Sequence, residues 1–141
     1  MFYIKVKFIF CKGLLYTSPM TNKDIATNFL RMVIEGNIDQ AYSQYVSPTM
    51  RHHNMHYPGD AQSLQKGMAE SHENLPHKKL ETKRVIAEGD TVAVHSHFRM
   101  QEGDIGFAVV HIFKIANDQI VEMWDIVQQI PEDSPNENGA F

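Results

Sequence analysis

The 141-residue chain contains a single cysteine, Cys11, and a single tryptophan. One cysteine can form neither an internal disulfide nor a cysteine-based zinc site, so a reducing compartment, the cytoplasm, is the expected location. The chain has 13 Lys and Arg against 17 Asp and Glu, a formal net charge of -4, and no cluster of basic residues stands out. This balance argues against nucleic acid as a partner.

Long apolar runs are also missing. The apolar stretch at residues 1–19 is interrupted by Lys5, Lys7 and Lys12, and no small-residue cleavage site follows it. A secretory signal peptide needs a longer uninterrupted apolar run, and a transmembrane helix needs about 20 apolar residues. We therefore expect no membrane partner, and we interpret residues 1–19 as an N-terminal extension that the domain can lose.

The N-terminal half of the remaining chain has helical periodicity. Apolar side chains recur at helical spacing over residues 22–35, directly after a capping box formed by Thr21 and Asp24. Two further helical patterns cover residues 38–46 and 60–73. The length suits a single domain with one core, so these three helices are expected to pack together.

From Lys79 onward the periodicity changes to two. Turn sequences at 88–90, 102–104 and 117–118 divide this half into four antiparallel strands. The predicted fold class is therefore α+β, with one domain at residues 20–131. Residues 132–141 are rich in Pro, Asn and Glu, which predicts a polar C-terminal tail without regular structure.

Four strings in the strand half resemble one known family. They are Val85–Asp90, Val92–His97, Ala108–Phe113 and Ile120–Asp125, and together they resemble the SnoaL-like branch of the NTF2-like superfamily. The resemblance implies an NTF2-like cone, in which three N-terminal helices pack on a curved antiparallel sheet around an apolar pocket. It also implies a homodimer through the sheet. Family members include polyketide cyclases and isomerases, so the fold does not define the reaction.

The resemblance implies an acid/base aspartate four residues after the strand tryptophan, Trp124. Here that position is Gln128. An amide cannot exchange a proton as an acid or base, so Gln128 can only orient a carbonyl or an enol. Asp125, on the opposite face of the strand, is the carboxylate that remains for acid/base work. The alternative is that Asp125 is a paired or dimer-interface carboxylate.

Histidines supply the other candidates. His53 and Asn54 match the pair that the family has at the mouth of its pocket, where a neutral imidazole can accept a proton alpha to a carbonyl. His111 shares a strand face with Phe113, and a buried histidine there needs a partner such as Asp125. For both histidines the alternative is a structural, hydrogen-bonded role. The predicted catalytic residues are Asp125, His53 and His111, and the predicted substrate-binding residues are Asn54, Trp124, Gln128, Phe113 and His97.

A metal site is the competing interpretation of the strand histidines. His95, His97 and Glu102 reproduce most of the first metal motif of cupins, and His111 would be the fourth ligand. The second cupin motif is absent, and cupins lack the large helical half. We therefore expect no metal, and we interpret His95, His97 and Arg99 as the polar face of a strand at the dimer seam.

Two main hypotheses for the function follow. The first is a small-molecule-pocket protein with cofactor-free proton-transfer chemistry, such as isomerisation or aldol cyclisation, on a small apolar carbonyl compound. The second is a catalytically silent ligand-binding or interaction module of the same fold, which the departure at Gln128 allows. A metal-dependent cupin-like enzyme ranks third.

Overall fold

The computed structural model describes residues 18–141. Most of the predicted N-terminal extension therefore lies outside the described residues. Within them, no helix is long and apolar enough to cross a membrane. The elements, in chain order, are α1 (Asn22–Ile34), α2 (Ile38–Tyr45), β1 (Val46–His52), α3 (Ala61–Asn74), β2 (Lys79–Glu88), β3 (Thr91–Arg99), β4 (Phe107–Ala116) and β5 (Gln119–Gln129).

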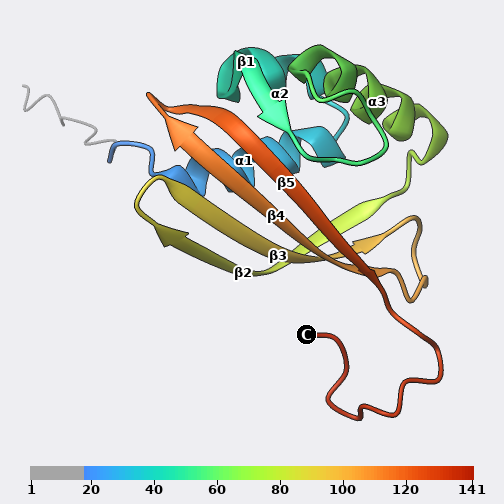
Figure 1. Cartoon of the computed structure of the whole chain (residues 1–141). Helices are drawn as coiled ribbons and strands as arrows, with labels where there is room; N and C mark the ends of the chain where they lie inside the picture. Colours follow the sequence, from blue (N-terminus) through green and yellow to red (C-terminus); the bar gives the residue numbers. More distant parts are fainter. Residues whose placement is uncertain (1–17) are drawn as a thin grey trace, which may run out of the picture.

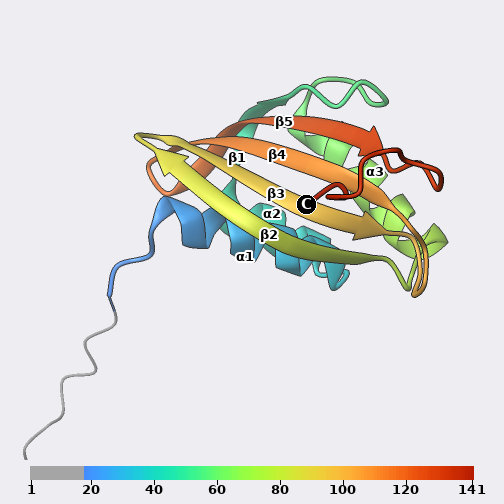
Figure 2. The same ribbon diagram turned by 90° about the horizontal axis from the view of Figure 1, so that it is seen from below.

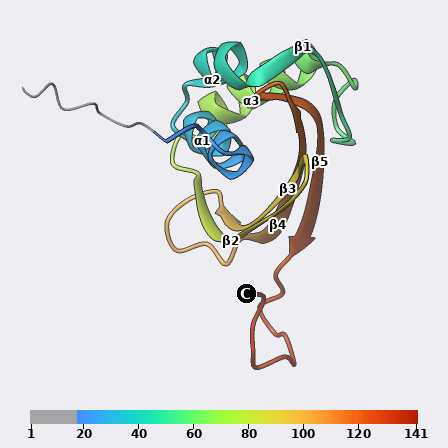
Figure 3. The same ribbon diagram turned by 90° about the vertical axis from the view of Figure 1, so that its left-hand side faces the viewer.

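The strands form one curved sheet in the order β1-β5-β4-β3-β2. Strands β2 to β5 pair antiparallel with their sequence neighbours, whereas β1 pairs parallel with β5. The three helices lie on the concave side of this sheet (Figures 1 and 3). The predicted α+β class, three helices and the four-strand meander are confirmed. The sequence prediction missed β1, because Pro48 within it is a residue that only an edge strand tolerates.

Local sequence accounts for the first helix. The side chain of Thr21 accepts a hydrogen bond from the Asp24 amide at 3.2 Å, and the Asp24 carboxylate accepts one from the Thr21 amide at 2.8 Å. This predicted capping box satisfies two backbone donors that the helix end leaves free. Gly36 then ends the helix region with a φ of 88°, and the ring of His72 from α3 packs where a side chain at Gly36 would lie.

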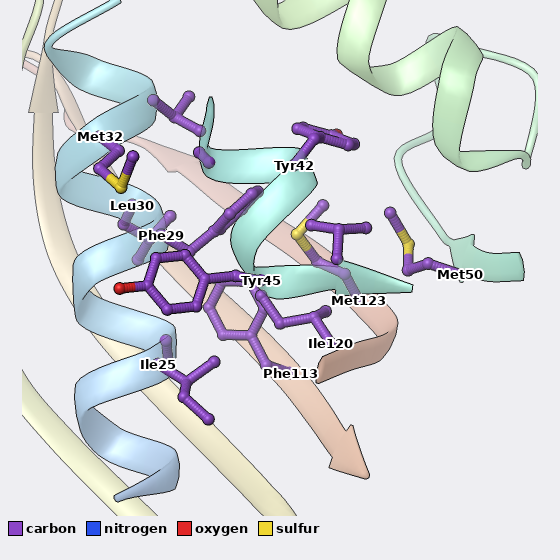
Figure 4. Packing of buried hydrophobic residues seen from close by; sticks show 14 of the residues in the cluster. Ile25, Phe29, Leu30, Met32, Tyr42, Tyr45, Met50, Phe113, Ile120 and Met123 are labelled. Carbon is purple, nitrogen blue, oxygen red and sulfur yellow. The ribbon is translucent and has the colours of Figure 1, made fainter. Parts of the chain in front are cut away.

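Two aromatic contacts connect the helices to the sheet. Phe29 of α1 is fully buried and meets Tyr42 of α2 and Phe113 of β4 edge to face, with ring centroids 5.6 and 5.9 Å apart (Figure 4). Edge-to-face packing favours aromatic pairs beyond the area that they bury. Phe29 is therefore the side chain that links both helices to the centre of the sheet.

Alternation along the strands separates two faces of the sheet. Val92 and Val94 on β3, Phe113 on β4 and Met123 on β5 are buried, and all face the helices. The register places Val94 opposite His111, so His111 also faces the helices. This concave face is called the inner face below, and the opposite, convex face is called the outer face.

The C-terminal segment, residues 130–141, contains no helix or strand. It turns back beneath the sheet and ends below β2 and β3 (Figures 1 and 2). The Phe141 ring lies 4.8 Å from the His97 ring and 5.4 Å from the His95 ring, and Lys83 Nζ lies 5.1 Å from its centroid. The predicted polar tail thus contacts the outer face through its aromatic residue.

The contacts of Phe29 with Tyr42 and Phe113 predict a large contribution of this side chain to stability. Phe29→Ala should lower the free energy of unfolding by about 3–5 kcal/mol, because it removes a large side chain whose cavity two helices and a strand cannot fill. Met55→Ala is the control, since Met55 is 92% exposed, and its cost should stay within about 0.5 kcal/mol. Urea denaturation followed by circular dichroism measures both. Similar costs for the two variants would contradict this account of the core.

Candidate functional site

His111 and Asp125 meet on the inner face. They are direct register partners on β4 and β5, and the next pair along the strands is Phe113 and Met123, which are buried. His111 Nε2 lies 3.6 Å from Asp125 Oδ1, and the side chains are 15% and 13% exposed. The structure therefore brings together two of the three predicted catalytic residues, in a largely buried position.

Asn54 is the third member of this group. Its Nδ2 donates a hydrogen bond of 2.7 Å to Asp125 Oδ2, across 71 positions of sequence. The backbone amide of Asn54 donates to His52 Nδ1 at 3.2 Å, while His52 Nε2 lies 2.5 Å from the carbonyl oxygen of Pro58. Because Nδ1 accepts, the proton of neutral His52 belongs on Nε2. The buried His52 ring thus holds the loop that places Asn54 against Asp125.

Two polar atoms of the pair have no partner among the described residues. His111 Nδ1 and Asp125 Oδ1 are buried and form no hydrogen bond. The 3.6 Å between His111 Nε2 and Asp125 Oδ1 is too long for a hydrogen bond, although it suits an ion pair or a contact that tightens when a ligand binds. Buried polar atoms are normally paired. These two atoms are therefore available to a third group.

The electrostatics of the pair favour a neutral imidazole. Burial lowers the pKa of His111, and the neighbouring Asp125 carboxylate raises it by less. Burial, and then the Asp125 charge, raise the pKa of Tyr42 above its ordinary value. The Tyr42 hydroxyl donates to Met68 Sδ, at 3.4 Å, and a thioether is a weak acceptor. Tyr42 is therefore a protonated phenol beside the carboxylate.

Tyr42 was absent from the predicted site. Its spacing within residues 38–46 indicates only the apolar side of a short helix, and nothing local shows that this side meets Asp125. The position of Tyr42 near Asp125 follows only from the packing of α2 on the sheet.

Phe113, which was predicted to bind substrate, lies on the inner face, but its ring packs against Phe29 in the core.

His53 and Trp124 lie on the outer face. Their rings stack with centroids 4.9 Å apart and an interplanar angle of 3°. His53 Nε2 donates to Glu122 Oε1 at 2.9 Å, and Arg51 forms a 3.1 Å ion pair with the same carboxylate. His53 and Asn54 are neighbours in sequence, yet they contact opposite faces of β5, because successive side chains of an extended chain alternate. The expectation that both lie at one pocket mouth is not met.

His97 and Gln128 also lie outside the inner face. Gln128 is exposed and is the register partner of Ala108, and His97 Nε2 lies 2.7 Å from the carbonyl oxygen of Ile105. Asp125 and Gln128 were expected on opposite faces of the strand, and the register agrees, since an odd separation changes the face. Gln128 and His97, which were predicted to bind substrate, therefore do not line the inner face with Asp125.

The proposed set of metal ligands does not converge. His95 and His97 belong to the outer face, whereas His111 belongs to the inner one, and Glu102 is paired with Lys79. Across residues 18–141, no group of three or more His, Cys, Asp or Glu side chains is placed to hold a metal ion. The described side chains therefore give no support to the cupin-like interpretation.

Several cavities lie away from the pair. One of about 340 Å³ separates α1 from β2, one of about 550 Å³ lies beside the connection from α3 to β2, and one of about 440 Å³ borders the turn from β3 to β4. Neither His111 nor Asp125 lines any of these three. Asn54 covers Asp125 instead, and Tyr57 of the same loop packs against Gly67 of α3. The loop that carries Asn54 and Tyr57 therefore borders the pair.

One protein family matches most of the chain. Residues 26–123 match the model of the SnoaL-like domain. The chain belongs to the SnoaL-like family. No curated protein matches it in sequence.

Solved structures show the same fold. An NTF2-like protein of unknown function from Cytophaga hutchinsonii superposes with a TM-score of 0.65 at 12% identity, covering 79% of this chain and 93% of that one. A SnoaL-like polyketide cyclase from Agrobacterium tumefaciens superposes with a TM-score of 0.65 at 11% identity, covering 79% and 94%. At these identities the likeness establishes the NTF2-like fold of this SnoaL-like chain, and the reaction has to be argued from the site.

The buried imidazole makes a prediction about pH. Because the pKa of His111 is lowered in the folded state, the unfolded chain binds its proton first as the pH falls, and folding then loses stability below about pH 6.5. His111→Gln should reduce the decline in the free energy of unfolding between pH 7 and pH 5. His56→Gln, which replaces an exposed histidine, is the control and should keep the decline of the parent. Denaturant titrations across this range test it, and equal slopes in the two variants would contradict it.

Proposed function

We propose that this SnoaL-like protein is a cofactor-free acid/base enzyme that moves a proton on a small apolar carbonyl compound. The observation that carries the proposal is the buried pair of His111 and Asp125, in which one nitrogen and one oxygen have no partner among the described residues. A titratable residue whose charge state is altered by burial and by a specific charged neighbour is a candidate for catalysis.

The pair suggests a division of roles. A neutral His111 with its proton on Nε2 has a free lone pair on Nδ1, which can accept a proton from a carbon alpha to a carbonyl. The Asp125 carboxylate faces Nε2 and stabilises the imidazolium that results. Asn54 holds the carboxylate through Oδ2, and the protonated phenol of Tyr42 is a donor for the enolate oxygen. Isomerisation and aldol cyclisation both begin with such an enolate.

Hydrogen–deuterium exchange on a panel of small carbonyl compounds tests this proposal. β-Diketones and β-keto esters are incubated with the protein in D₂O, and exchange at the α-carbon is followed by NMR. Asp125→Asn and His111→Gln should each slow the catalysed exchange by roughly 10²–10⁴-fold, the range for loss of a general acid or base.

Asp133→Asn makes the same chemical change in the exposed C-terminal segment and should leave the rate unchanged. Exchange by the parent protein that persists undiminished in Asp125→Asn would remove the carboxylate from the proposed mechanism. Equal rates with and without the parent protein, across the whole panel, would contradict proton-transfer catalysis.

A catalytically silent binding module is the second candidate. It is favoured by the Asn54 amide, which already occupies one oxygen of Asp125, and by the absence of the pair from the linings of the three cavities described above. In the exchange experiment, a module of this kind binds a panel compound, as seen by line broadening of its NMR signals, but exchanges no proton.

We also propose that the protein forms a homodimer through the outer face of its sheet. The supporting observation is an apolar patch on that face, formed by Val110 and Ile112 of β4, Trp124 and Ile126 of β5, and Ala93 of β3. Ile126 is 54% exposed and Ile86, on the neighbouring edge strand β2, is 63% exposed. An exposed apolar patch is a typical site of protein association.

Ile126→Glu should convert the dimer to a monomer at micromolar concentration, weakening association at least about tenfold, because it would bury an unpaired charge at the seam. Light scattering coupled to size-exclusion chromatography gives the mass. Gln62→Glu adds the same charge on the exposed side of α3 and should leave the dimer intact. A monomeric parent protein at the same concentration would disprove the proposed association.

A further inference from the structure

Lys78 is a buried lysine that the proposed function does not use. It lies in the short connection between α3 and β2, and only 7% of its surface is exposed. Lysine is almost never this buried unless a counter-charge accompanies it. The contacts of its amine therefore need an explanation.

The amine has one neutral partner. Lys78 Nζ donates a hydrogen bond of 3.0 Å to Ser71 Oγ on α3. Within residues 18–141 no carboxylate lies within 4.0 Å of it, whereas Lys66, Lys79, Lys83 and Lys114 all form ion pairs. Burial without a counter-charge lowers the pKa of Lys78. A hydroxyl satisfies the neutral amine as well as the ammonium ion, so the contact does not require the charge.

Lys78 is also one of the residues that line an open cavity. By strand alternation, Lys78 belongs to the same face as Leu80 and Thr82. These two residues pair with Phe98 and the fully buried Ser96. Its side chain accordingly leaves the sheet on the inner side, toward α3. The cavity next to it has a volume of about 550 Å³, enough for a small organic molecule, and its lining consists of Pro76, His77, Lys78, Lys79, Gln101 and Glu102.

We propose that Lys78 is a carbonyl-reactive amine that forms an imine with a small aldehyde or ketone entering this cavity. The lone pair of the unprotonated Nζ attacks the carbonyl carbon, a carbon–nitrogen bond forms, and the carbonyl oxygen leaves as water after proton transfer. The net reaction joins one amine and one carbonyl compound into one imine and one water, without oxidation or reduction. Desolvated lysines are the usual nucleophiles for this step.

The charged residues that line the cavity are compatible with imine formation at Lys78. Lys79 and Glu102 pair with each other across it, which leaves neither as a counter-ion for Lys78. His77 is the further titratable group of the lining and can relay the proton that the departing water needs. A purely structural explanation also exists, because a cation near the C-terminal end of α3 is favoured by the helix dipole.

Reductive labelling separates the two explanations. The full protein is treated with acetaldehyde and sodium cyanoborohydride between pH 6 and pH 8, and labelling of each lysine is measured by peptide mass spectrometry. Lys66 is the internal reference, since its side chain is 79% exposed on the same helix that contacts Lys78. We expect Lys78 to be labelled several-fold faster than Lys66 at pH 6, with a difference that narrows toward pH 8.

Two variants test whether the fast labelling belongs to Lys78. Ser71→Ala removes the hydrogen bond between Nζ and the Ser71 hydroxyl and should leave the pH dependence of Lys78 labelling unchanged, because that hydroxyl satisfies the neutral amine as well as the ammonium ion. Lys78→Met should abolish this fast labelling and leave that of Lys66 unchanged. Labelling of Lys78 that is slower than that of Lys66 at every pH, in protein with the parent circular dichroism spectrum, would overturn the proposal and leave the helix-end explanation.

The inference is independent of the proton-transfer proposal. Imine formation at Lys78 requires neither Asp125 nor His111, so Asp125→Asn should be labelled at Lys78 as fast as the parent. Loss of deuterium exchange with normal Lys78 labelling would therefore support the acid/base pair on its own, whereas normal exchange in Lys78→Met would show that the two sites act separately.

Discussion

The register between β4 and β5 is the constraint on which the rest of the structure depends. It pairs Phe113 with Met123 beneath the helices and, two residues further along, His111 with Asp125. Because side chains alternate, burial of the first pair forces the second pair onto the same inner face. Slippage of β5 by one residue against β4 would turn Met123 and Asp125 to the outer face and would separate the carboxylate from His111.

Burial of the His111 and Asp125 side chains lowers the stability of the folded protein. An imidazole and a carboxylate lie next to the core, and two of their atoms lack partners among the described residues, although buried polar groups are destabilising when they are unpaired. The fold tolerates them because the neighbouring aromatic packing and the Asn54 hydrogen bond hold both side chains in place. Unpaired polar atoms in a well-packed face are more easily explained by a ligand than by stability.

Sequence reasoning succeeded where the determinants are local. The capping box at Thr21 and the turns that contain Gly89 and Gly103 depend on neighbouring residues alone, and the helices and the meander follow from them. It failed for β1, a proline-containing edge strand that pairs in the sheet with β5, some 70 residues later. The inner-face position of Asp125 was inferred from alternation, but the hydrogen bond from Asn54 and the electrostatic effect of Asp125 on Tyr42 depend on packing between distant elements.

The amino-acid order alone determined the fold class, the family and the alternation of faces within each strand, since these depend on spacing and local conformation. Tertiary structure decided which face is buried and which loop covers it. It separated His53 from Asn54 and placed Trp124, Gln128 and His97 on the outer face. It also buried Lys78 without a counter-charge among residues 18–141. The physical reason is that periodicity defines the two sides of a strand, whereas only the packing of helices against the sheet defines which side is the interior.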